Sequence, residues 1–485
     1  MRIKPFLLPR LQDMIFLTIF LAVLLFGQRM LNLDGDLPRH LLTGKLILQT
    51  RTVPTTEPFI YPYEGREYVS HEWLADVILY LIHVLSGEAG IVLLSAILLA
   101  STFSILYSHL SARLNIRIPV FLIVAWGAAA TSLNWSLRPY LFSMLSLAIW
   151  LVLTDKLERD EKIPLWYFPA LMLLWVNLHG EFIAGILVLF AYAVGWLWDY
   201  LFNRPSVDIN TGKRLWLILL FSLLATLLNP AGFRPWRVMV GFVNNDYLMS
   251  RMYEANPPDF GQPQFLVLLG LLVFSLILLG LKKERLSAGK AFLLAGFSAM
   301  SLMAGRNIHL YGVVAPFVLA EAFIGIREAK LVNRFEEIIE RVESQVRGIL
   351  WPVLITVAFG FVLLFSDFKA IYHFDPEVFP VDAVRWLEAH PPQGRMFNHL
   401  DWGGYIAFHL WPEQYTFIDS MADVTGEITR KFETVITLEA GWEDVLSEYQ
   451  VEWVIIPAES RLADALKEAG FILHYQDETA VILRR

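Results

Sequence analysis

Two carboxylates and a histidine follow the first long apolar run of the chain, within NLDGDLPRHLLTG at residues 32–44. Asp34 or Asp36 could act as a general base, which takes a proton from an attacking hydroxyl group. His40 comes one helical turn after Asp36, so these two side chains could face the same cavity. Carboxylate oxygens equally suit a divalent cation, and Asp36 also fits the N-cap of a short helix, so its role stays open at this point.

A second polar pair, His71 and Glu72, opens the amphipathic stretch HEWLADVILYLIHVLSG. Imidazole and carboxylate groups near Asp34 and Asp36 would suit either proton transfer or ligation of a divalent cation. More polar residues stand at the ends of later apolar runs: Asn134, Arg138, Asn177, His179, Glu181, Asn229, Arg306, Asn307 and His309. Snorkelling or helix capping explains any single one of them, but their common side favours a site at one membrane face.

The composition places the elements that carry these residues in a membrane. Of the 485 residues, 56% are hydrophobic and only 18% are charged, whereas about a quarter are charged in soluble domains. No cysteine is present, which excludes disulfides and thiolate sites. The first apolar run is expected to be an uncleaved span, because no small-residue cleavage site follows it.

The hydropathy pattern predicts an α-helical polytopic membrane protein with about eleven transmembrane helices. They are expected near residues 14–31, 89–107, 119–134, 138–154, 164–178, 182–201, 215–229, 264–281, 291–305, 309–325 and 349–366. The stretch 71–87 could cross as well, or lie flat on the membrane as an amphipathic helix.

Basic residues decide the orientation through the positive-inside rule. If 71–87 lies flat, the basic clusters fall on the side of the N-terminus, near residues 113–117, 156–162, 204–214, 282–290 and 327–347. We therefore predict a cytoplasmic N-terminus, with the first loop 32–88 and the C-terminal segment 367–485 outside the cytoplasm. The clusters are small and scattered, so nothing indicates nucleic-acid binding.

The segment 367–485 is expected to form a small extracytoplasmic α/β domain, separate from the transmembrane domain 1–366. Helices are predicted at VDAVRWLEAH and LADALKEAG, strands at RMFNHL, YTFID and VEWVIIP, and a hairpin in FILHYQDETAVILRR. The glycines of DWGGY suit a tight turn with a close backbone approach. Asp419 and Asp423 follow a predicted strand end, where ligand groups often stand, although turn formation explains them better. Residues 327–347 should form a charged amphipathic surface helix.

The order of these features resembles the C-type glycosyltransferases, the GT-C superfamily, which includes protein O-mannosyltransferases and the aminoarabinose transferases acting on lipid A. In those proteins an acidic pair follows the first span, and a Lys-Pro-Pro-Leu-like stretch opens a second surface helix. Here Asp34 and Asp36 stand at the acidic pair, and His71, Glu72, Trp73 and Leu74 stand at that stretch. A set of bacterial membrane proteins in the superfamily is similar over DGDLPRHLLTGKLI, VPTTEPF, SHEWLA, LRPYLFS, VNLHGEF, LLNPAGF, YEANPPDF, DWGGY and FIDSMAD.

The resemblance implies an enzyme of the bacterial plasma membrane that moves a sugar from a polyprenyl-phosphate donor to a lipid, glycan or protein acceptor. It makes a first-loop aspartate, Asp34 or Asp36, the general base. Glu254, in the outer loop 229–263, is a candidate third carboxylate, as partner of the base or as metal ligand. The candidate substrate-binding residues are His40, His71, Glu72, Arg138, His179, Arg306 and His309. Either arginine could pair with the donor phosphate, and no cofactor is indicated beyond a divalent cation that the carboxylates could hold.

Two other functions compete with this one. A transporter or flippase of lipid-linked glycans would place polar groups near the bilayer midplane on broken helices, whereas the predicted spans carry no charge there. A non-catalytic membrane scaffold would need none of the carboxylates. Exchange of Asp34 or Asp36 for asparagine would abolish sugar transfer and leave a scaffold unaffected.

Overall fold

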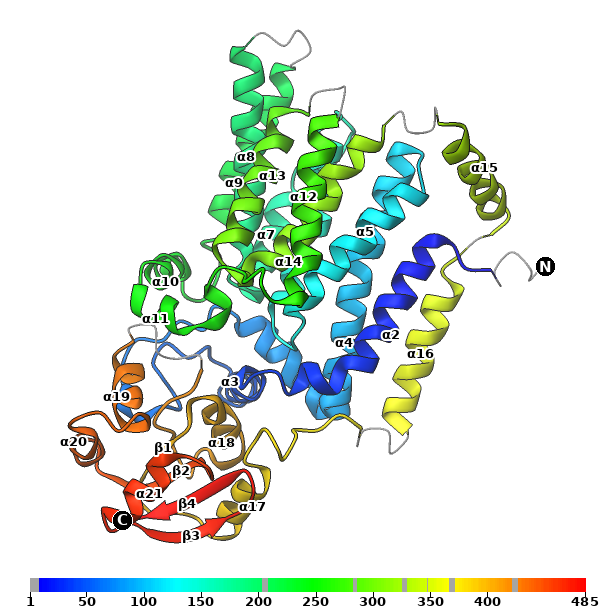
Figure 1. Cartoon of the computed structure of the whole chain (residues 1–485). Coiled ribbons are helices and arrows are strands. Elements are labelled where there is room, and N and C mark those ends of the chain that lie inside the picture. The colour runs from blue at the N-terminus through cyan, green and yellow to red at the C-terminus, as the bar shows by residue number, and fades with distance from the viewer. Residues whose placement is uncertain are drawn as a thin grey trace.

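A computed structural model describes residues 8–202, 208–281, 286–324, 329–346, 348–365, 371–420 and 426–485. The predicted Asp423 and parts of the basic connections, residues 203–207, 282–285 and 325–328, lie outside the described residues. Figure 1 shows a helical bundle with a smaller α/β unit at one end, and helix α3 between the two.

Every predicted span contains a helix. These helices are α2 (Leu11–Leu31), α4 (Trp73–Leu114), α5 (Ile118–Thr131), α6 (Tyr140–Glu158), α7 (Tyr167–Leu178), α8 (Phe182–Leu201), α9 (Ile209–Ala225), α12 (Leu266–Leu281), α13 (Ala288–Met303), α14 (Ile308–Leu319) and α16 (Leu350–Phe365). Five helices of the described part are long and apolar enough to cross a membrane: Leu11–Leu31, Trp73–Leu114, Tyr140–Glu158, Phe182–Leu201 and Pro263–Leu281. The total of eleven crossings therefore stays a prediction.

Helix α4 contains the break that the stretch 71–87 predicted. Its 42 residues would measure about 63 Å as one straight helix, roughly twice the apolar thickness of a bilayer. Gly87 leaves the helical conformation, with φ 64° and ψ −158°. Glycine can adopt a positive φ without steric cost. The chain therefore turns at Gly87, which separates residues 73–86 of α4 from residues 88–114.

The first loop and the loop after α9 contain short helices rather than extended chain alone. The first loop holds α3 (Asp36–Thr50) and the 3₁₀ turn η1 (Tyr61–Tyr63). The loop after α9 holds α10 (Arg234–Val243), α11 (Asp246–Arg251) and the 3₁₀ turn η3 (Tyr253–Ala255). Helix α15 (Lys330–Ser344) confirms the predicted amphipathic surface helix and lies at the end of the bundle away from the α/β unit (Figure 1).

The C-terminal segment forms a four-stranded mixed sheet in the order β1-β2-β4-β3. Strand β1 (Arg395–Asn398) pairs parallel with β2 (Val451–Pro457), while β4 (Ala480–Arg484) pairs antiparallel with both β2 and β3 (Ile472–Gln476). The hairpin, the buried strand VEWVIIP and the helices α17 (Val381–Ala389) and α21 (Arg461–Glu468) confirm their predictions.

Two predictions in this segment were wrong. YTFID forms no strand, because its only ladder contact is a single bridge between Thr416 and Ile60 of the first loop. DWGGY forms no tight turn, because Gly403 and Gly404 begin helix α18 (Gly403–Leu410) in helical conformation. The close backbone approach is present, however, since a Cβ on Gly403 would lie 2.0 Å from the carbonyl oxygen of Ile418.

The two faces of the sheet pack against different helices. Met396, Trp453 and Ile455 belong to one buried cluster with α17, α18 and the bundle, whereas the alternating residues Phe397 and Val454 belong to a second one with α19 (Glu427–Ile436), α20 (Trp442–Glu448) and α21. Successive side chains of a strand point to opposite faces, so both faces of this sheet are covered.

An ion network holds the end of the bundle that lies away from the α/β unit. Asp155 of α6 has no exposed side-chain surface and lies 2.8 Å from both His109 and Arg113 of α4. Lys290 of α13 lies 2.6 Å from Glu321, which also pairs with Arg113. Burial of these charges is tolerated because each meets an opposite charge. The network ties α4, α6 and α13 together far from the predicted site.

Candidate functional site

The predicted acidic pair stands at the start of α3, at the end of the bundle that faces the α/β unit (Figure 1). Gly35 is the N-cap of α3, so the placement of Asp36 at that position was wrong by one residue. The carboxylate of Asp34 instead accepts the backbone N–H of Asp36 at 3.1 Å. Asp36 is thereby free of a capping role, and its side chain points to other partners.

Arg138, directly before α6, gathers three carboxylates from distant parts of the chain. Its Nε lies 2.9 Å from Oδ2 of Asp34, its Nη2 lies 2.8 Å from Oδ2 of Asp36, and its Nη1 lies 3.3 Å from Oε2 of Glu254. The planar guanidinium group offers donors in a fixed fork, which a lysine could not provide. The structure therefore brings together all three predicted catalytic residues around one predicted phosphate-binding residue.

Glu254 connects this group to a second arginine. Its Oε1 lies 2.9 Å from Nη2 of Arg306, which stands just before α14. The loop carrying Glu254 is held there by the backbone N–H of Gly305, which donates to the carbonyl of Asn256 at 2.9 Å. We refer to Asp34, Asp36, Arg138, Glu254 and Arg306 as the acid–arginine cluster. Three carboxylates face two guanidinium groups, so the cluster has one negative charge in excess when all of its members are ionised.

Burial changes the proton affinity within the cluster. Desolvation raises the pKa of Asp34, and neighbouring Asp36 adds to this effect, whereas Arg138 opposes it. Burial also opposes the charge on Arg138, but the carboxylates of Asp36, Asp34 and Glu254 outweigh that effect and raise its pKa. Arg138 therefore stays cationic, while Asp34 binds a proton more readily than a solvated aspartate does.

The predicted histidines form a second group beside the cluster, in a chain that alternates imidazole and carboxylate. His40 Nδ1 lies 2.7 Å from Oδ1 of Asp76 and 3.8 Å from Oε2 of Glu72. The other oxygen of Glu72 lies 3.1 Å from His179 and 3.7 Å from His71.

The chain continues across the bundle through Glu181. Its Oε2 lies 3.5 Å from His179 Nδ1, and its Oε1 lies 2.8 Å from His309 Nε2. The ring of His309 packs 4.8 Å from that of Tyr140, two residues beyond Arg138. We refer to Asp76, His40, Glu72, His71, His179, Glu181 and His309 as the histidine–carboxylate chain; it connects α3 and α4 with the ends of α7, α8 and α14.

Attraction between neighbouring imidazole and carboxylate groups sets the ionisation states within the histidine–carboxylate chain. Burial alone would raise the pKa of Glu72, but His71, His179 and His40 hold it well below its usual range. Burial disfavours the charged form of His179, yet Glu181 and Glu72 raise its pKa to about 9. His179 is therefore an imidazolium and Glu72 a carboxylate at neutral pH.

Sequence reasoning missed some members of the histidine–carboxylate chain and one contact of the acid–arginine cluster. Asp76 was not predicted, although it follows Glu72 by one helical turn, the spacing that places both on one helix face. Glu181 was noted only as one of the polar residues at helix ends. Ser420 lies within the quoted stretch FIDSMAD but was not singled out: its hydroxyl donates to Asp36 from a position far along the chain, so only the tertiary fold reveals the contact.

The α/β unit docks directly on the first loop. Arg39, whose side chain has no exposed surface, lies 2.7 Å from Asp419 of the α/β unit and 2.9 Å from Glu57 of the first loop. A Cβ on Gly35 would lie 2.0 Å from the carbonyl oxygen of Asp401, so the two backbones touch beside Asp36. Asp419 therefore holds the interface rather than a ligand, and DWGGY provides the contact surface.

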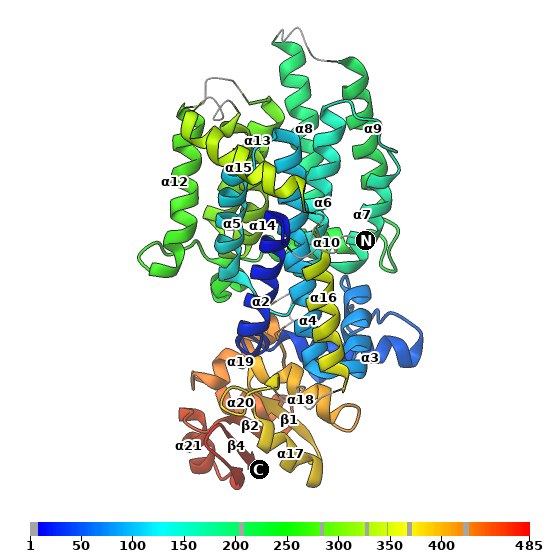
Figure 2. The same cartoon turned by 90° about the vertical axis from the view of Figure 1, so that its right-hand side faces the viewer.

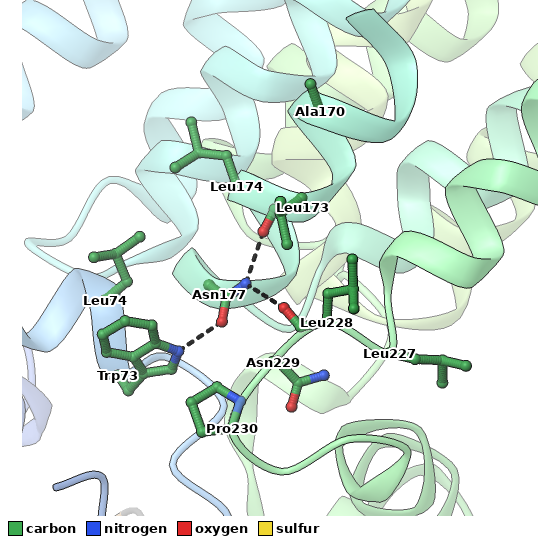
Figure 3. Close-up of a pocket in the computed structure, with 10 residues that line it drawn as sticks. All are labelled: Trp73, Leu74, Ala170, Leu173, Leu174, Asn177, Leu227, Leu228, Asn229 and Pro230. Atoms are coloured by element: carbon green, nitrogen blue, oxygen red, sulfur yellow. Dashed lines mark hydrogen bonds between the residues drawn. The ribbon is translucent and has the colours of Figure 1, made fainter. Parts of the chain in front are cut away.

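An open, mainly apolar groove of about 670 Å³ lies next to the histidine–carboxylate chain. It is lined by Trp73, Leu74, Ala170, Leu173, Leu174, Asn177, Leu227, Leu228, Asn229 and Pro230 (Figure 3). Asn177 closes its polar end, where it accepts the indole N–H of Trp73 at 2.7 Å and donates to the carbonyl of Leu228 at 3.1 Å. Trp73 follows Glu72 directly, so the groove begins beside the middle of the histidine–carboxylate chain.

The acid–arginine cluster does not have the form of a metal site. Within the described residues, no group of three or more His, Asp or Glu side chains could hold a metal ion. The carboxylates of Asp34, Asp36 and Glu254 converge on a guanidinium group, which occupies the position that a cation would take between them. The predicted divalent cation therefore finds no matching donor set in this arrangement.

Comparison with known proteins identifies the fold. No protein-family model matches the sequence, and no curated protein matches it. The structure is similar to that of the Archaeoglobus fulgidus oligosaccharyltransferase in the apo form, with a TM-score of 0.55 and 12% identity over 92% of this chain and 70% of that one. The same enzyme tethered to an acceptor peptide gives a TM-score of 0.51 and 13% identity over 96% of this chain and 73% of that one.

A second similar structure covers both chains almost completely. ArnT from Cupriavidus metallidurans bound to undecaprenyl phosphate matches with a TM-score of 0.50 and 14% identity, over 96% of this chain and 97% of that one. Identities this low establish the architecture alone. The chain therefore has the fold of the Archaeoglobus fulgidus oligosaccharyltransferase and of ArnT from Cupriavidus metallidurans.

Proposed function

We propose that the protein is a membrane glycosyltransferase, which moves a sugar from a polyprenyl-phosphate donor to an acceptor at the acid–arginine cluster. The observation that carries this proposal is the convergence of Asp34, Asp36 and Glu254 on Arg138. Glycosyl transfer of this kind needs a base for the acceptor and a cation for the leaving phosphate, and the cluster offers both within a few ångströms.

Asp36 or Asp34 acts as the base in this mechanism. The acceptor hydroxyl oxygen forms a bond to the anomeric carbon of the sugar, while the bond from that carbon to the phosphate oxygen breaks. The hydroxyl proton passes to the carboxylate, and the electron pair of the broken bond leaves with the carrier phosphate. Attack opposite the phosphate inverts the anomeric centre. The raised pKa of Asp34 and the excess carboxylate of the cluster both favour proton uptake.

Arg138 and Arg306 bind the phosphate that leaves. Both guanidinium groups already hold carboxylate oxygens, with Glu254 between them. Two oxygens of a phosphate group can accept the two parallel N–H groups of a guanidinium fork, as the two oxygens of a carboxylate do. A phosphate can therefore replace Glu254 on either arginine. Glu254 then becomes available to the acceptor side of the reaction, as partner of the base.

The apolar groove holds part of the polyprenyl tail. Its wall is formed largely by leucines of α7 and of the turn after α9, and it opens beside Trp73 and Asn177 (Figure 3). A tail in this groove brings its phosphate to the level of Glu72 and His179, next to the helix ends that carry the cluster. The ArnT structure with undecaprenyl phosphate supports a lipid of this class.

The α/β unit and the bundle together enclose the acceptor side. Ser420 of the α/β unit contacts Asp36. Tyr247 and Arg251 of α11, which precede Glu254 by seven and three residues, bind Glu433 of α19. An acceptor that reaches Asp36 must therefore pass between the outer loop and the α/β unit. We place this side outside the cytoplasm, in agreement with the distribution of basic residues.

The experiment is an incubation of the purified protein, in lipid nanodiscs, with a panel of labelled polyprenyl-phosphate sugars and a membrane extract as acceptor source. The proposal predicts that one donor loses its sugar and releases carrier phosphate, with a labelled covalent product. A folded protein that releases no carrier phosphate across the panel contradicts it. Movement of the donor between leaflets without a covalent product would instead identify a flippase.

A further inference from the structure

Helix α15 lies away from the proposed site and has one face that no part of the described structure covers. Leu331, Phe335, Ile338 and Val342 follow one another at intervals of four, three and four residues, and their side chains are 46 to 70% exposed. At about 100° per residue these four positions form one narrow row along the helix. A row of large apolar side chains on a helix rich in charge needs a partner.

The opposite flank of α15 is attached to the bundle by two carboxylates. Glu336 is fully buried and accepts the backbone N–H groups of Arg117 and Ile118, at 2.9 and 2.8 Å, which begin α5. Glu343 accepts the backbone N–H of Leu11, at 2.9 Å, which begins α2. Carboxylates at helix N-termini are favourable because they satisfy free N–H groups and face the positive end of the helix dipole.

These contacts fix the depth of α15. Helix α2 is long and apolar enough to cross a membrane, and it starts where α15 holds it. The next helix, α16, follows α15 after a few residues and also exposes large apolar side chains, among them Val353 and Val357. Helix α15 therefore lies level with the first residues of apolar helices, which is the headgroup region of a bilayer.

The basic residues of α15 stand on one side of the row, with Glu337 beyond them on the same side and Glu340 opposite the row. Lys330, Arg334 and Arg341 are exposed and stand about 60 to 100° to one side of the row, whereas Glu336 and Glu343 stand about 120 to 140° to the other side. Long basic side chains at the edge of an apolar face reach the phosphate groups of lipids while their stems stay in the apolar layer.

We infer that α15 is an in-plane membrane anchor, which inserts the row Leu331–Phe335–Ile338–Val342 into the lipid interface and places its basic flank against anionic headgroups. This holds α2 and α5 at a fixed depth through Glu336 and Glu343. The inference does not depend on the proposed sugar transfer.

Spin labels on single cysteines test it in the whole protein, because the natural chain has no cysteine. Phe335→Cys and Ile338→Cys report on the row, and Glu337→Cys and Glu340→Cys on the polar face serve as matched controls. The labelled variants are placed in nanodiscs, and collision rates with oxygen and with a water-soluble nickel chelate are measured by electron paramagnetic resonance. A size-exclusion profile and unfolding temperature equal to those of the parent show that each variant is folded.

The anchor predicts that labels in the row collide more with oxygen and less with nickel than the control labels do. Equal nickel collisions in row and control overturn it, since the row then faces water. Dipolar broadening between row labels overturns it in favour of a second copy of the chain as partner. A triple variant, Lys330→Gln, Arg334→Gln and Arg341→Gln, tests the basic flank. In nanodiscs that contain phosphatidylglycerol, labels in the row of this variant should lie less deep in the bilayer and collide more with nickel. In nanodiscs of phosphatidylcholine alone, their depth should not change. Unchanged depth in both lipids overturns the contact with anionic headgroups.

Discussion

At the scale of residues, Arg138 organises the candidate site. One guanidinium group holds three carboxylates that enter from the first loop and from the loop after α9. Without it, three negative charges would stand close together in a partly buried place, where like charges repel strongly. The same group is a natural partner for the phosphate of a lipid-linked donor. The proposed transfer and the stability of this region are therefore expected to depend on the same side chain.

Exchange of Arg138 for lysine or glutamine should separate these two roles. Arg138→Lys keeps the charge and loses the fork, so we expect a small loss of stability and a large loss of transfer rate. Arg138→Gln also removes the charge, and we expect a further loss of about 1–3 kcal/mol in the free energy of unfolding. Thermal unfolding in nanodiscs and the transfer assay measure the two effects. Wild-type activity in Arg138→Lys would show that the fork is unimportant.

His179 predicts a dependence of stability on alkaline pH. Its pKa rises from an ordinary value near 6.5 to about 9 in the folded protein. The folded state thus binds the proton more tightly than the unfolded state, so its stabilising effect is complete below about pH 6.5 and disappears as the pH rises through about 9. The expected loss is at most about 3 kcal/mol.

The measurement is the unfolding temperature between pH 6.5 and pH 9.5, for the wild type and for His179→Gln. The wild type should lose stability across this window, and the variant should start lower and change less. A His390→Gln variant, which alters an exposed histidine of the α/β unit, should follow the wild type. Identical slopes for His179→Gln and the wild type would contradict the raised pKa.

At the scale of elements, close backbone contacts place the α/β unit on the bundle. Gly35 allows the start of α3 to touch the backbone of Asp401, and Gly404 touches the carbonyl oxygen of Gly35 in return. Neither contact leaves space for a side chain. Main-chain contacts therefore form the part of the docking surface that lies beside Asp36, in addition to the buried ion pair of Arg39 and Asp419.

Gly35→Ala should displace this contact. Its Cβ would lie 2.0 Å from a backbone oxygen, a distance that forces one of the two elements to move. We expect faster proteolysis and hydrogen exchange in α18, together with a reduced transfer rate, while the bundle stays folded. Gly296→Ala in α13 is the matched control, because a Cβ there meets nothing within 4 Å. Equal protection of α18 in both variants would contradict the docking role.

The sequence predicted the helices well because hydropathy alone selects them. It singled out Asp34, Asp36 and Arg138 because charged groups at helix ends are rare in an apolar chain, and the resemblance to the GT-C superfamily added Glu254 as a loop carboxylate; the structure brings all four together. The sequence could not foresee that one arginine would bind all three carboxylates, because Arg138, the first loop and the loop after α9 lie far apart in the sequence. Asp76 escaped notice because it lies inside an apolar run, and YTFID failed as a strand because its only partner is a distant loop.

At the scale of the whole molecule, the buried charged side chains gather at the two ends of the helical bundle. The buried network around Asp155 holds the helices at one end, while the acid–arginine cluster and the histidine–carboxylate chain lie at the other end, which faces the α/β unit; Figure 2 shows the α/β unit at this end of the bundle. The first end carries buried ion pairs, and the second adjoins the apolar groove. The division is consistent with a scaffold at one membrane face and a reaction at the other.

The orientation follows from this division and can be tested by labelling. Glu439→Cys in the α/β unit and Gln345→Cys after α15 both replace exposed residues. In intact spheroplasts, a membrane-impermeant maleimide should label Glu439→Cys, and it should label Gln345→Cys only after lysis. The reverse pattern would place the acid–arginine cluster in the cytoplasm and contradict the predicted topology.

The measurement that tests the central claim most directly is the single-turnover release of carrier phosphate by Asp34→Asn and Asp36→Asn. Asp401→Asn is the matched control, because its side chain is 66% exposed and lies in the same interface region. The mechanism predicts that at least one of the two cluster variants loses about 10²-fold or more in rate, with its unfolding temperature retained and the control unchanged. Release at the wild-type rate by both variants would contradict the assignment of the acid–arginine cluster as the place of sugar transfer.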